Sequence, residues 1–333
     1  MLGFLNRLRA RLISLRHYIA LGGLVGALAA LILSILIFMP GPHGDTKRVL
    51  LERGASLRSV AATVDAAGAL RSGLVFRLYV RLRGQAGRLK AGEFDIPPRA
   101  SMDDVRLALI GGDVVMHKIT IAEGLTSRQI IEQLTAESVL SGSVTVPPEG
   151  TLLPETYSVP RGMKRQALVD KMMAAQQATL EALWPLRQKW LPVKTPYEAL
   201  ILASIVERET GIAEERPLVA AAFVNRLKKG MRLQSDPTII YGLVGGQGPL
   251  GRPIRRSEIR RKTAYNTYRI NGLPPTPIAN PGRASIAAVL NPADSQALYF
   301  VADGTGGHVF AETLSAHNRN VRRWREIEKQ RRP

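Results

Sequence analysis

The sequence predicts an α+β protein with a single N-terminal transmembrane helix, a small α+β subdomain and a larger mixed α+β domain. Three observations support this prediction. Residues 18–39 form an apolar run without a charged side chain. Two similar strand, turn and helix patterns follow within residues 49–146. After residue 147, helical apolar patterns alternate with loops rich in Pro and Gly, which is typical of a mixed fold.

The apolar run at residues 18–39 is long enough to cross a bilayer as a helix. Arg7, Arg9, Arg11 and Arg16 precede it. By the positive-inside rule, residues 1–17 are then a cytoplasmic segment and everything after residue 40 lies across the membrane. A cleaved signal peptide is the alternative, but its apolar region usually has only about 7 to 15 residues.

The formal net charge is +19, from 46 Lys and Arg residues against 27 Asp and Glu residues. Such an excess usually indicates nucleic acid or an anionic surface as a partner. The predicted topology puts the basic regions outside the cytoplasm, so we expect no nucleic acid. The remaining polyanions are phospholipid head groups and cell-wall polymers.

Several classes of site are absent from the sequence. The chain has no cysteine, so neither disulfides nor thiolate metal sites are expected. Its five histidines have no metal-ligand spacing, and no P-loop, G-x-S-x-G or G-x-G-x-x-G motif occurs. We therefore expect neither a metal nor a cofactor, and carboxyl chemistry gains by elimination.

Past a linker at residues 40–48, the pattern predicts a strand at 47–52, helices at 54–64 and 75–83, and a strand at 91–96. A helix follows at 101–110, capped by Ser101 with Asp104 at the box position. Residues 118–134 repeat the strand, Gly turn and helix of residues 48–64. This unit is similar to LysM-type glycan-binding modules, which makes residues 49–146 a LysM-like region; a purely structural role is the alternative.

Residues 146–162, rich in Pro and Gly, mark the start of the next domain, assigned to residues 147–317. Helices are expected at 166–190 and 215–229, the second ended by Gly230. Residues 231–242 predict a strand followed by a turn and a helix. Gln234, Ser235 and Asp236 fall at that turn, where clustered polar groups are typical of substrate contacts.

Between these helices, residues 195–211 predict the most informative helix of the chain. Thr195 caps it, Pro196 occupies the first helical position, Glu198 closes a capping box and Gly211 is a fitting stop. Almost every residue from 199 to 206 is apolar, so the helix is expected to be buried nearly all round.

Glu207 ends this apolar helix, and its carboxyl is the strongest candidate for chemistry. Desolvation raises the pKa of such a carboxyl and suits it to general acid catalysis. Glu209 is the rival. Two residues apart on a helix means about 200° of rotation, so the two carboxyls cannot act as a pair; one is expected to face the site and the other water. The alternative is that Glu207 is only the first exposed residue after a core helix.

Four segments carry a resemblance to a known family: LASIVERET at 202–210, NRLKKGMRLQSDPTIIYG at 225–242, TAYNTYRINGLPPTPIANPG at 263–282 and YFVADGTGGHVF at 299–310. Together they resemble the MltG (YceG-like) endolytic murein transglycosylases. The resemblance implies that Glu207 is the catalytic acid and base, with Glu209 and His308 in supporting roles.

The resemblance also implies the reaction and the cleft. A lytic transglycosylase is a lyase that needs one carboxyl group. It protonates the β-1,4 glycosidic oxygen between N-acetylmuramic acid and N-acetylglucosamine, and the muramoyl 6-hydroxyl then closes on C1 to give a 1,6-anhydro end. Residues implied as substrate contacts are Gln234, Ser235, Asp236, Tyr241, Tyr265, Asn266, Thr267, Tyr268, Glu155 and Tyr157. Leu152 and Leu153 stand where the family often has aromatic residues.

The prediction is thus an enzyme anchored in the cytoplasmic (inner) membrane, with an extracytoplasmic or periplasmic catalytic domain that cuts nascent peptidoglycan strands and ends their elongation. By resemblance, its partners are peptidoglycan synthases or division machinery. Residues 318–333 predict a basic C-terminal helix, either lying on anionic lipid or wall polymer or simply solvated. Two alternatives remain: a non-catalytic peptidoglycan-binding scaffold, and a hydrolase that pairs Glu207 with Asp236.

Overall fold

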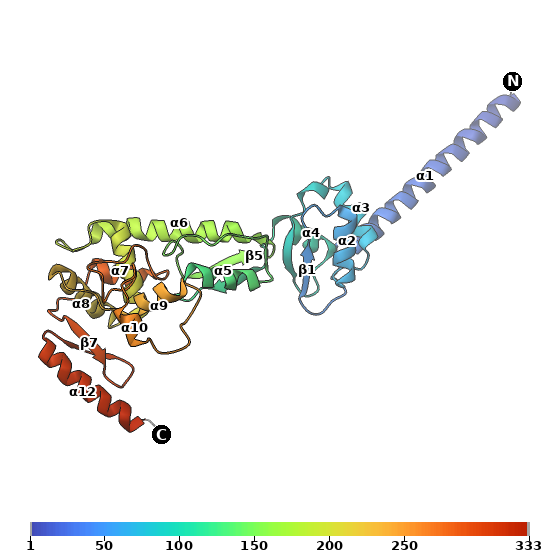
Figure 1. The fold of residues 1–333 in the computed structure, drawn as a ribbon. Coiled ribbons are helices and arrows are strands. Elements are labelled where there is room, and N and C mark those ends of the chain that lie inside the picture. The colour runs from blue at the N-terminus through green and yellow to red at the C-terminus, as the bar shows by residue number, and fades with distance from the viewer. Residues whose placement is uncertain (1, 332–333) are drawn as a thin grey trace. The chain divides into compact units, whose positions relative to one another are not determined.

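The computed structural model describes residues 2–331, with side chains for residue 17 and residues 19–330. The chain divides into two compact units, residues 1–117 and residues 118–333. Figure 1 labels many of the elements of both units. Each unit is described by itself.

The first unit begins with a long helix, α1 (Leu2–Phe38). Its segment Ile19–Phe38 has a mean hydropathy of 2.6, and 6% of the most apolar window is buried. By length and composition this segment fits a membrane anchor or a signal sequence. Among its described side chains, those near its end join a core: Ile37 is buried in a hydrophobic cluster that includes residues of α4, and Leu33 packs against it.

The rest of the first unit has a β-α-α-β-α order. Its elements are β1 (Lys47–Leu51), α2 (Leu57–Ala66), α3 (Gly73–Leu82), a 3-10 turn (Ala86–Arg88), β2 (Gly92–Ile96) and α4 (Met102–Gly111). The two strands pair antiparallel, with Val49 opposite Phe94. Apolar side chains from the sheet and the helices, among them Val64, Phe76 and Leu109, fill one core.

Local sequence accounts for these helix starts. Ser56, Ser72 and Ser101 cap α2, α3 and α4, because each hydroxyl accepts a backbone N–H of the first turn. The predicted capping box of Ser101 and Asp104 is confirmed in both directions. The expected strands and helices of this region are present within a few residues of their predicted bounds.

The second unit contains the remaining elements. They are β3 (Met116–Thr120), α5 (Ser127–Ala136), β4 (Leu140–Ser141), β5 (Thr156–Pro160), β6 (Met163–Lys164), α6 (Arg165–Leu183), α7 (Pro196–Glu209), α8 (Arg216–Lys228), α9 (Asp236–Val244), α10 (Arg256–Arg260), α11 (Arg283–Leu290), β7 (Tyr299–Ala302), β8 (His308–Ala311) and α12 (Leu314–Arg331). β3 pairs with β5, β4 runs parallel to β6, and β7 is antiparallel to β8. The predicted second strand, turn and helix unit is confirmed as β3 followed by α5.

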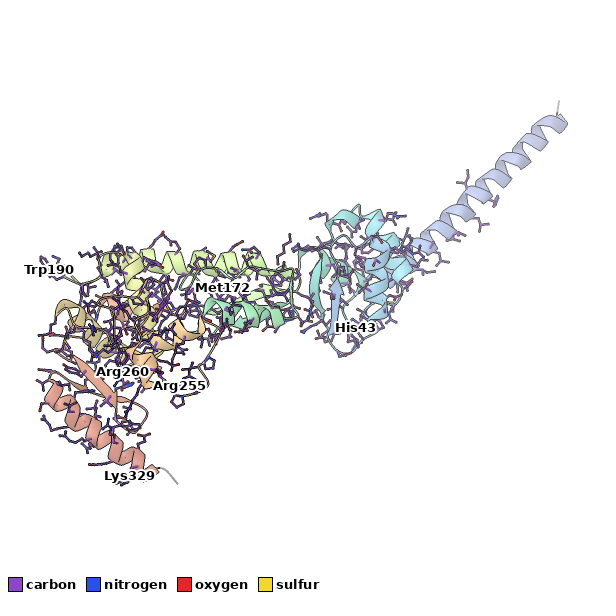
Figure 2. The ribbon with its side chains drawn as sticks, in the orientation of Figure 1. His43, Met172, Trp190, Arg255, Arg260 and Lys329 are labelled. Carbon is purple, nitrogen blue, oxygen red and sulfur yellow. The ribbon has the colours of Figure 1, made fainter. Side chains whose placement is uncertain are left out.

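Two hydrophobic cores hold this unit together. The first joins β3, α5, β5 and α6, and it buries Leu134, Val159 and Met172, the last of which is labelled in Figure 2. The second lies between α7, α8 and α11, where Ile205, Phe223 and other apolar side chains are fully buried. As expected, α7 is buried nearly all round, because it packs against both α8 and α11.

Three predicted elements differ from the structure. The helix expected at 166–190 ends at Leu183, followed by a 3-10 turn at Trp184–Leu186; Pro185 lacks an N–H and cannot continue an α-helix. No strand forms at residues 231–233, ahead of the predicted turn; Gln234 follows with φ +52°, a left-handed conformation that interrupts an extended chain. The last helix begins at Leu314, before the predicted start at residue 318, and packs on β7 and β8 (Figure 1).

Candidate active site

The candidate site is built around the end of α7. Thr195 accepts the backbone N–H of Glu198 at 3.1 Å and Pro196 opens the helix, as the sequence predicts. The Glu198 carboxylate accepts the N–H of Lys194 at 2.5 Å, one residue before the expected partner. α7 ends at Glu209, with Thr210 as its C-cap. The last turn therefore carries both candidate carboxyls.

Glu207 is 8% exposed and lies in a polar contact between three segments. Its Oε2 accepts the backbone N–H of Gly282 at 2.8 Å, and its Oε1 lies 3.3 Å from Arg216 Nη2. The same Nη2 donates to Glu123 Oε2 at 2.6 Å. Glu207 thus connects α7 to the start of α8, to the start of α11 and to the loop after β3.

Burial raises the pKa of Glu207, and the negative charge of Glu123 raises it further, while the N–H of Gly282 and the charge of Arg216 oppose the shift. The contact is closely packed, because a Cβ on Gly282 would lie 2.0 Å from Glu123 Oε1. Among the described residues, Glu207 lines none of five cavities of about 200 to 800 Å³. The expected acid is therefore buried, and both of its carboxyl oxygens have partners.

Glu209 lies on the opposite side of α7 and lines a cavity of about 420 Å³. Its Oε1 accepts the Ser235 hydroxyl at 2.5 Å. Burial raises the pKa of Glu209 to about 7, helped by the charge of Asp236, although Ser235, His308 and Arg226 act in the other direction. Glu207 is buried and Glu209 is half-buried. The expectation that one of the two carboxyls faces open water is therefore wrong.

The Glu209 cavity is formed by six segments of the second unit. They are the end of α7, α8, the loop into α9, the segment after α10, β7 and the start of α12. The residues that line it are Glu209, Arg226, Leu233, Gln234, Asp236, Tyr268, Tyr299, Phe300, Leu314, His317 and Asn318. Most of these side chains are polar or aromatic, which is typical of a site for a polar organic ligand.

Four residues predicted as substrate contacts meet at this cavity or beside it. Gln234 and Asp236 line the cavity directly, and the Tyr268 hydroxyl donates to Asp236 Oδ1 at 2.7 Å. Ser235 holds Glu209. The backbone between Gln234 and Asp236 is fixed from outside, because Ser235 N–H donates to Thr267 Oγ1 at 2.9 Å.

Asn266 and Thr267, by contrast, are interior residues of the fold. Asn266 is 1% exposed; its amide donates to the carbonyls of Glu258, Ile259 and Arg261, and its Oδ1 accepts the N–H of Tyr268. The expectation that these two side chains line the cleft is wrong, because their polar atoms are already used by the backbone and by neighbouring hydroxyls.

The other predicted contacts lie elsewhere. Tyr241 lines a separate cavity of about 200 Å³ and packs on Tyr265, with ring centroids 5.0 Å apart. Tyr157 is buried on β5, and its hydroxyl donates to Leu153 O at 2.8 Å; the pKa of Tyr157 rises to about 12 through burial. Glu155 is exposed at the start of the same strand. These four predictions therefore do not converge on Glu209.

His308 lies on β8 and pairs with Glu215, whose carboxylate accepts from the His308 backbone and contacts its Nδ1, both at 2.7 Å. It lines a cavity of about 520 Å³ next to α12. Its charge still reaches Glu209 and lowers the pKa of that carboxyl. His308 is thus close to the site without lining it.

Sequence reasoning missed several residues of the site, notably Arg226, Tyr299 and His317. Arg226 carries one usable signal: it is a cation within an otherwise apolar helix face, and such a residue is rarely buried without bound partners. In the structure it is 7% exposed and donates to the carbonyls of Leu298 and Leu233. No group of three or more potential metal ligands occurs among the described residues.

The chain is similar to known proteins of one family. A model of the YceG-like family matches residues 49–323. The chain is 32% identical over 321 residues to the endolytic murein transglycosylase of Streptococcus pneumoniae (strain D39), covering 81% of this chain and 57% of that relative. It is 28% identical over 308 residues to the enzyme of the same name from Bacillus subtilis (strain 168), covering 82% and 83% of the two chains.

A crystal structure of a YceG-like protein from Listeria monocytogenes matches the fold with a TM-score of 0.52 and 28% identity. The match covers 83% of this chain and 99% of that chain. The mixed α+β architecture is therefore shared with a solved structure. The chain spans somewhat more than half the length of the streptococcal relative, 57%.

Proposed function

The chain belongs to the YceG-like family, and on that premise we propose that it is a membrane-anchored endolytic murein transglycosylase. The proposed substrate is the β-1,4-linked glycan of peptidoglycan, cut within the strand. Two curated relatives with this name support the reaction class.

The observation that carries the proposal is the position of Glu209 at a polar cavity, with a pKa of about 7. Near neutral pH, a carboxyl group with this pKa is protonated in a large fraction of the molecules and can donate its proton. The carboxylate that results can take a proton back. A glycosidic oxygen leaves only when it is protonated. Glu209 combines the required pKa with access to a ligand.

In the proposed reaction, Glu209 donates its proton to the glycosidic oxygen as the bond from C1 to that oxygen breaks. The 6-hydroxyl of the same muramoyl residue forms a new bond to C1, and its proton passes to the Glu209 carboxylate. One C–O bond breaks and one forms, no water is consumed, and the acid is regenerated. One carboxyl group is sufficient for both proton transfers.

The sequence and the resemblance favoured Glu207 for this role, and the geometry favours Glu209. Glu207 has a raised pKa as well, but both of its oxygens are engaged by Gly282 and Arg216. A proton donor needs space for the leaving oxygen within about 3 Å. We therefore propose Glu209 as the acid and base, and Glu207 as the residue that anchors the last turn of α7.

A two-carboxylate hydrolase is the second candidate, because Asp236 lines the same cavity as Glu209. A hydrolase of this kind uses a second carboxylate to activate water or to attack C1. Tyr268 donates to Asp236 Oδ1 at 2.7 Å, so that oxygen is already engaged by a neighbouring side chain. The two reactions differ in their products, since hydrolysis adds one water and leaves a reducing end.

The finer features remain proposals. The apolar helix at Ile19–Phe38 supports a single-pass anchor in the cytoplasmic membrane with the second unit outside. The repeated strand, turn and helix units at β1–α2 and β3–α5 support LysM-like glycan binding. Peptidoglycan synthases or division machinery are proposed as partners through family resemblance alone.

Mass spectrometry of the products from purified peptidoglycan tests the proposal, with the full chain in detergent beside Glu209→Gln and Glu207→Gln. We expect internal fragments with 1,6-anhydro ends from the unmodified protein, none from Glu209→Gln, and the same fragments from Glu207→Gln. Products heavier by one water would support the hydrolase. Binding without any product would support the non-catalytic scaffold, and loss of products in Glu207→Gln alone would restore Glu207 as the acid.

A further inference from the structure

The α12 helix contributes three residues to the wall of the Glu209 cavity. They are Leu314, His317 and Asn318, all in its first two turns. The helix is held in place by packing on β7 and β8. The sequence predicted a domain that ends at residue 317 and a basic tail at residues 318–333. In the structure α12 spans that boundary, and its first turns line the same cavity as Glu209.

The ring of His317 is fixed by aromatic contacts. It stacks on Tyr299 with ring centroids 5.1 Å apart and an interplanar angle of 24°. The Arg226 guanidinium lies 5.2 Å from the centroid of the same Tyr299 ring. A ring held in this way loses little conformational freedom when a ligand binds, which favours specific recognition.

The two ring nitrogens of His317 are in different environments. Nδ1 is buried and has no hydrogen-bond partner. Burial lowers the pKa of His317, and the charge of Arg226 lowers it further, so the ring is neutral at pH 7. Burying an N–H without an acceptor costs about 1–3 kcal/mol, whereas a lone pair next to a cation costs little. We therefore assign the single proton to Nε2.

We propose that His317 and Asn318 bind the sugar residue in the Glu209 cavity, with His317 donating from Nε2 to a hydroxyl or N-acetyl oxygen. Asn318 is exposed beside it, and its amide supplies both a donor and an acceptor. Asp236 and Gln234 line the same cavity and supply acceptors. The ligand class is a β-1,4-linked N-acetylhexosamine chain, an identification that rests on the proposed function.

Binding to a short β-1,4-linked N-acetylglucosamine oligomer, measured by calorimetry on the full chain in a Glu209→Gln background, tests this role without any chemistry. We expect His317→Ala to weaken binding about tenfold, the worth of one good hydrogen bond. His317→Gln should restore most of the affinity, because its Nε2 extends as far as the ring Nε2. His317→Asn, which mimics only Nδ1, should not.

Trp324→Leu is the matched control for a loosened helix. Trp324 is on α12 but lines the cavity of about 520 Å³ beside His308 and Phe310. The control should lower the melting temperature and leave the dissociation constant unchanged. Equal weakening by Trp324→Leu and His317→Ala, no difference between the Gln and Asn variants, or no measurable binding by the Glu209→Gln reference would overturn the proposal.

Turnover separates this proposal from the proposed function. In the active chain, His317→Ala should raise KM about tenfold and change kcat little, because the contact is made in the ground state as well as in the transition state. Products from purified peptidoglycan with an unchanged KM would leave the transglycosylase standing and refute the role of His317. No products, with oligomer binding that still depends on His317, would refute the reaction and keep the binding site.

Discussion

Glu207 and Glu209 leave α7 on opposite sides and are held by different groups. Glu207 Oε1 lies 3.3 Å from Arg216 Nη2, and Glu209 Oε1 accepts the Ser235 hydroxyl at 2.5 Å. Consecutive helical residues are about 100° apart, so two residues on one turn contact separate environments. One carboxyl joins three segments of the fold, and the other borders a cavity. Their roles can therefore be tested one at a time.

Glu209→Gln should abolish turnover, and Glu207→Gln should not. Removing a general acid costs about 10² to 10⁴ in rate, so we expect a loss of at least about a hundredfold for Glu209→Gln. Glu207→Gln should lose less than about tenfold, while its free energy of unfolding falls by about 1–3 kcal/mol through the weakened contact with Arg216. Initial rates and urea unfolding of both variants provide the measurement; the opposite ranking of rates would reassign the acid.

The rate should fall as the pH rises above about 7. Only protonated Glu209 can protonate the leaving oxygen, and burial holds its pKa at about 7. Above that pH the protonated fraction falls tenfold for each pH unit, and kcat/KM falls with it. A profile of kcat/KM between pH 5 and 9 checks this. A limb centred near pH 4.5 would mean that Glu209 is not the group that titrates.

Stability should respond to the same group. The pKa of Glu209 rises from 4.5 to about 7 on folding, so the folded state binds more protons than the unfolded state within that window. This contribution is fully present below about pH 4.5 and is lost as the pH rises through 7. Glu209→Gln has no group that titrates at this position. Its melting temperature, relative to that of the unmodified protein, should therefore rise between pH 5 and pH 8. Equal differences at both pH values would contradict the assignment.

Gly282→Ala should disrupt the contact around Glu207. The new Cβ would meet Glu123 Oε1 at 2.0 Å, so Glu123 must move away from Arg216. We expect a loss of about 1–3 kcal/mol in the free energy of unfolding. In the double variant with Glu123→Ala, the loss in the free energy of unfolding should be smaller than the sum of the two single-variant losses, because both changes break the same ion pair between Glu123 and Arg216. Gly211→Ala, where no atom lies within 4 Å of the new Cβ, is the control; full additivity would refute the coupling.

Asn266→Ala should destabilise the fold without changing substrate affinity. Its amide donates to three backbone carbonyls, with the shortest distance, 2.6 Å, to Arg261 O. Leaving these groups unpaired costs about 1–3 kcal/mol in the free energy of unfolding. At a temperature where the variant stays folded, its KM should equal that of the unmodified protein. A KM raised severalfold at full folding would return Asn266 to the substrate site.

Local signals in the sequence predicted most elements of the fold. The capping box of α4 and the Thr195 cap of α7 act through residues three positions apart, and such contacts do not depend on the rest of the fold. The strand expected ahead of the turn at residues 234–236 does not form, for a tertiary reason. Gln234 takes a left-handed conformation there, with its N–H bound to Thr267 O.

The site was harder to predict, because α7 is buried on all sides and its apolar pattern indicates no preferred face. The rotation of about 100° per helical residue predicted that the two carboxyls point apart, but it did not predict which of them borders a cavity. That depends on β7 and α12, which lie about a hundred residues further along the chain. His317 had no motif to mark it, and only its contact with Tyr299 reveals its position.

The contribution of α12 to the Glu209 cavity also sets an order of events in biosynthesis. A ribosome makes the chain from its N-terminus, and Leu314, His317 and Asn318 come after every other residue that lines the cavity. The segment that carries Glu209 is therefore made well before this last wall. A nascent chain has Glu209 beside an unfinished cavity, and premature termination before residue 314 yields a protein that lacks one side of that cavity.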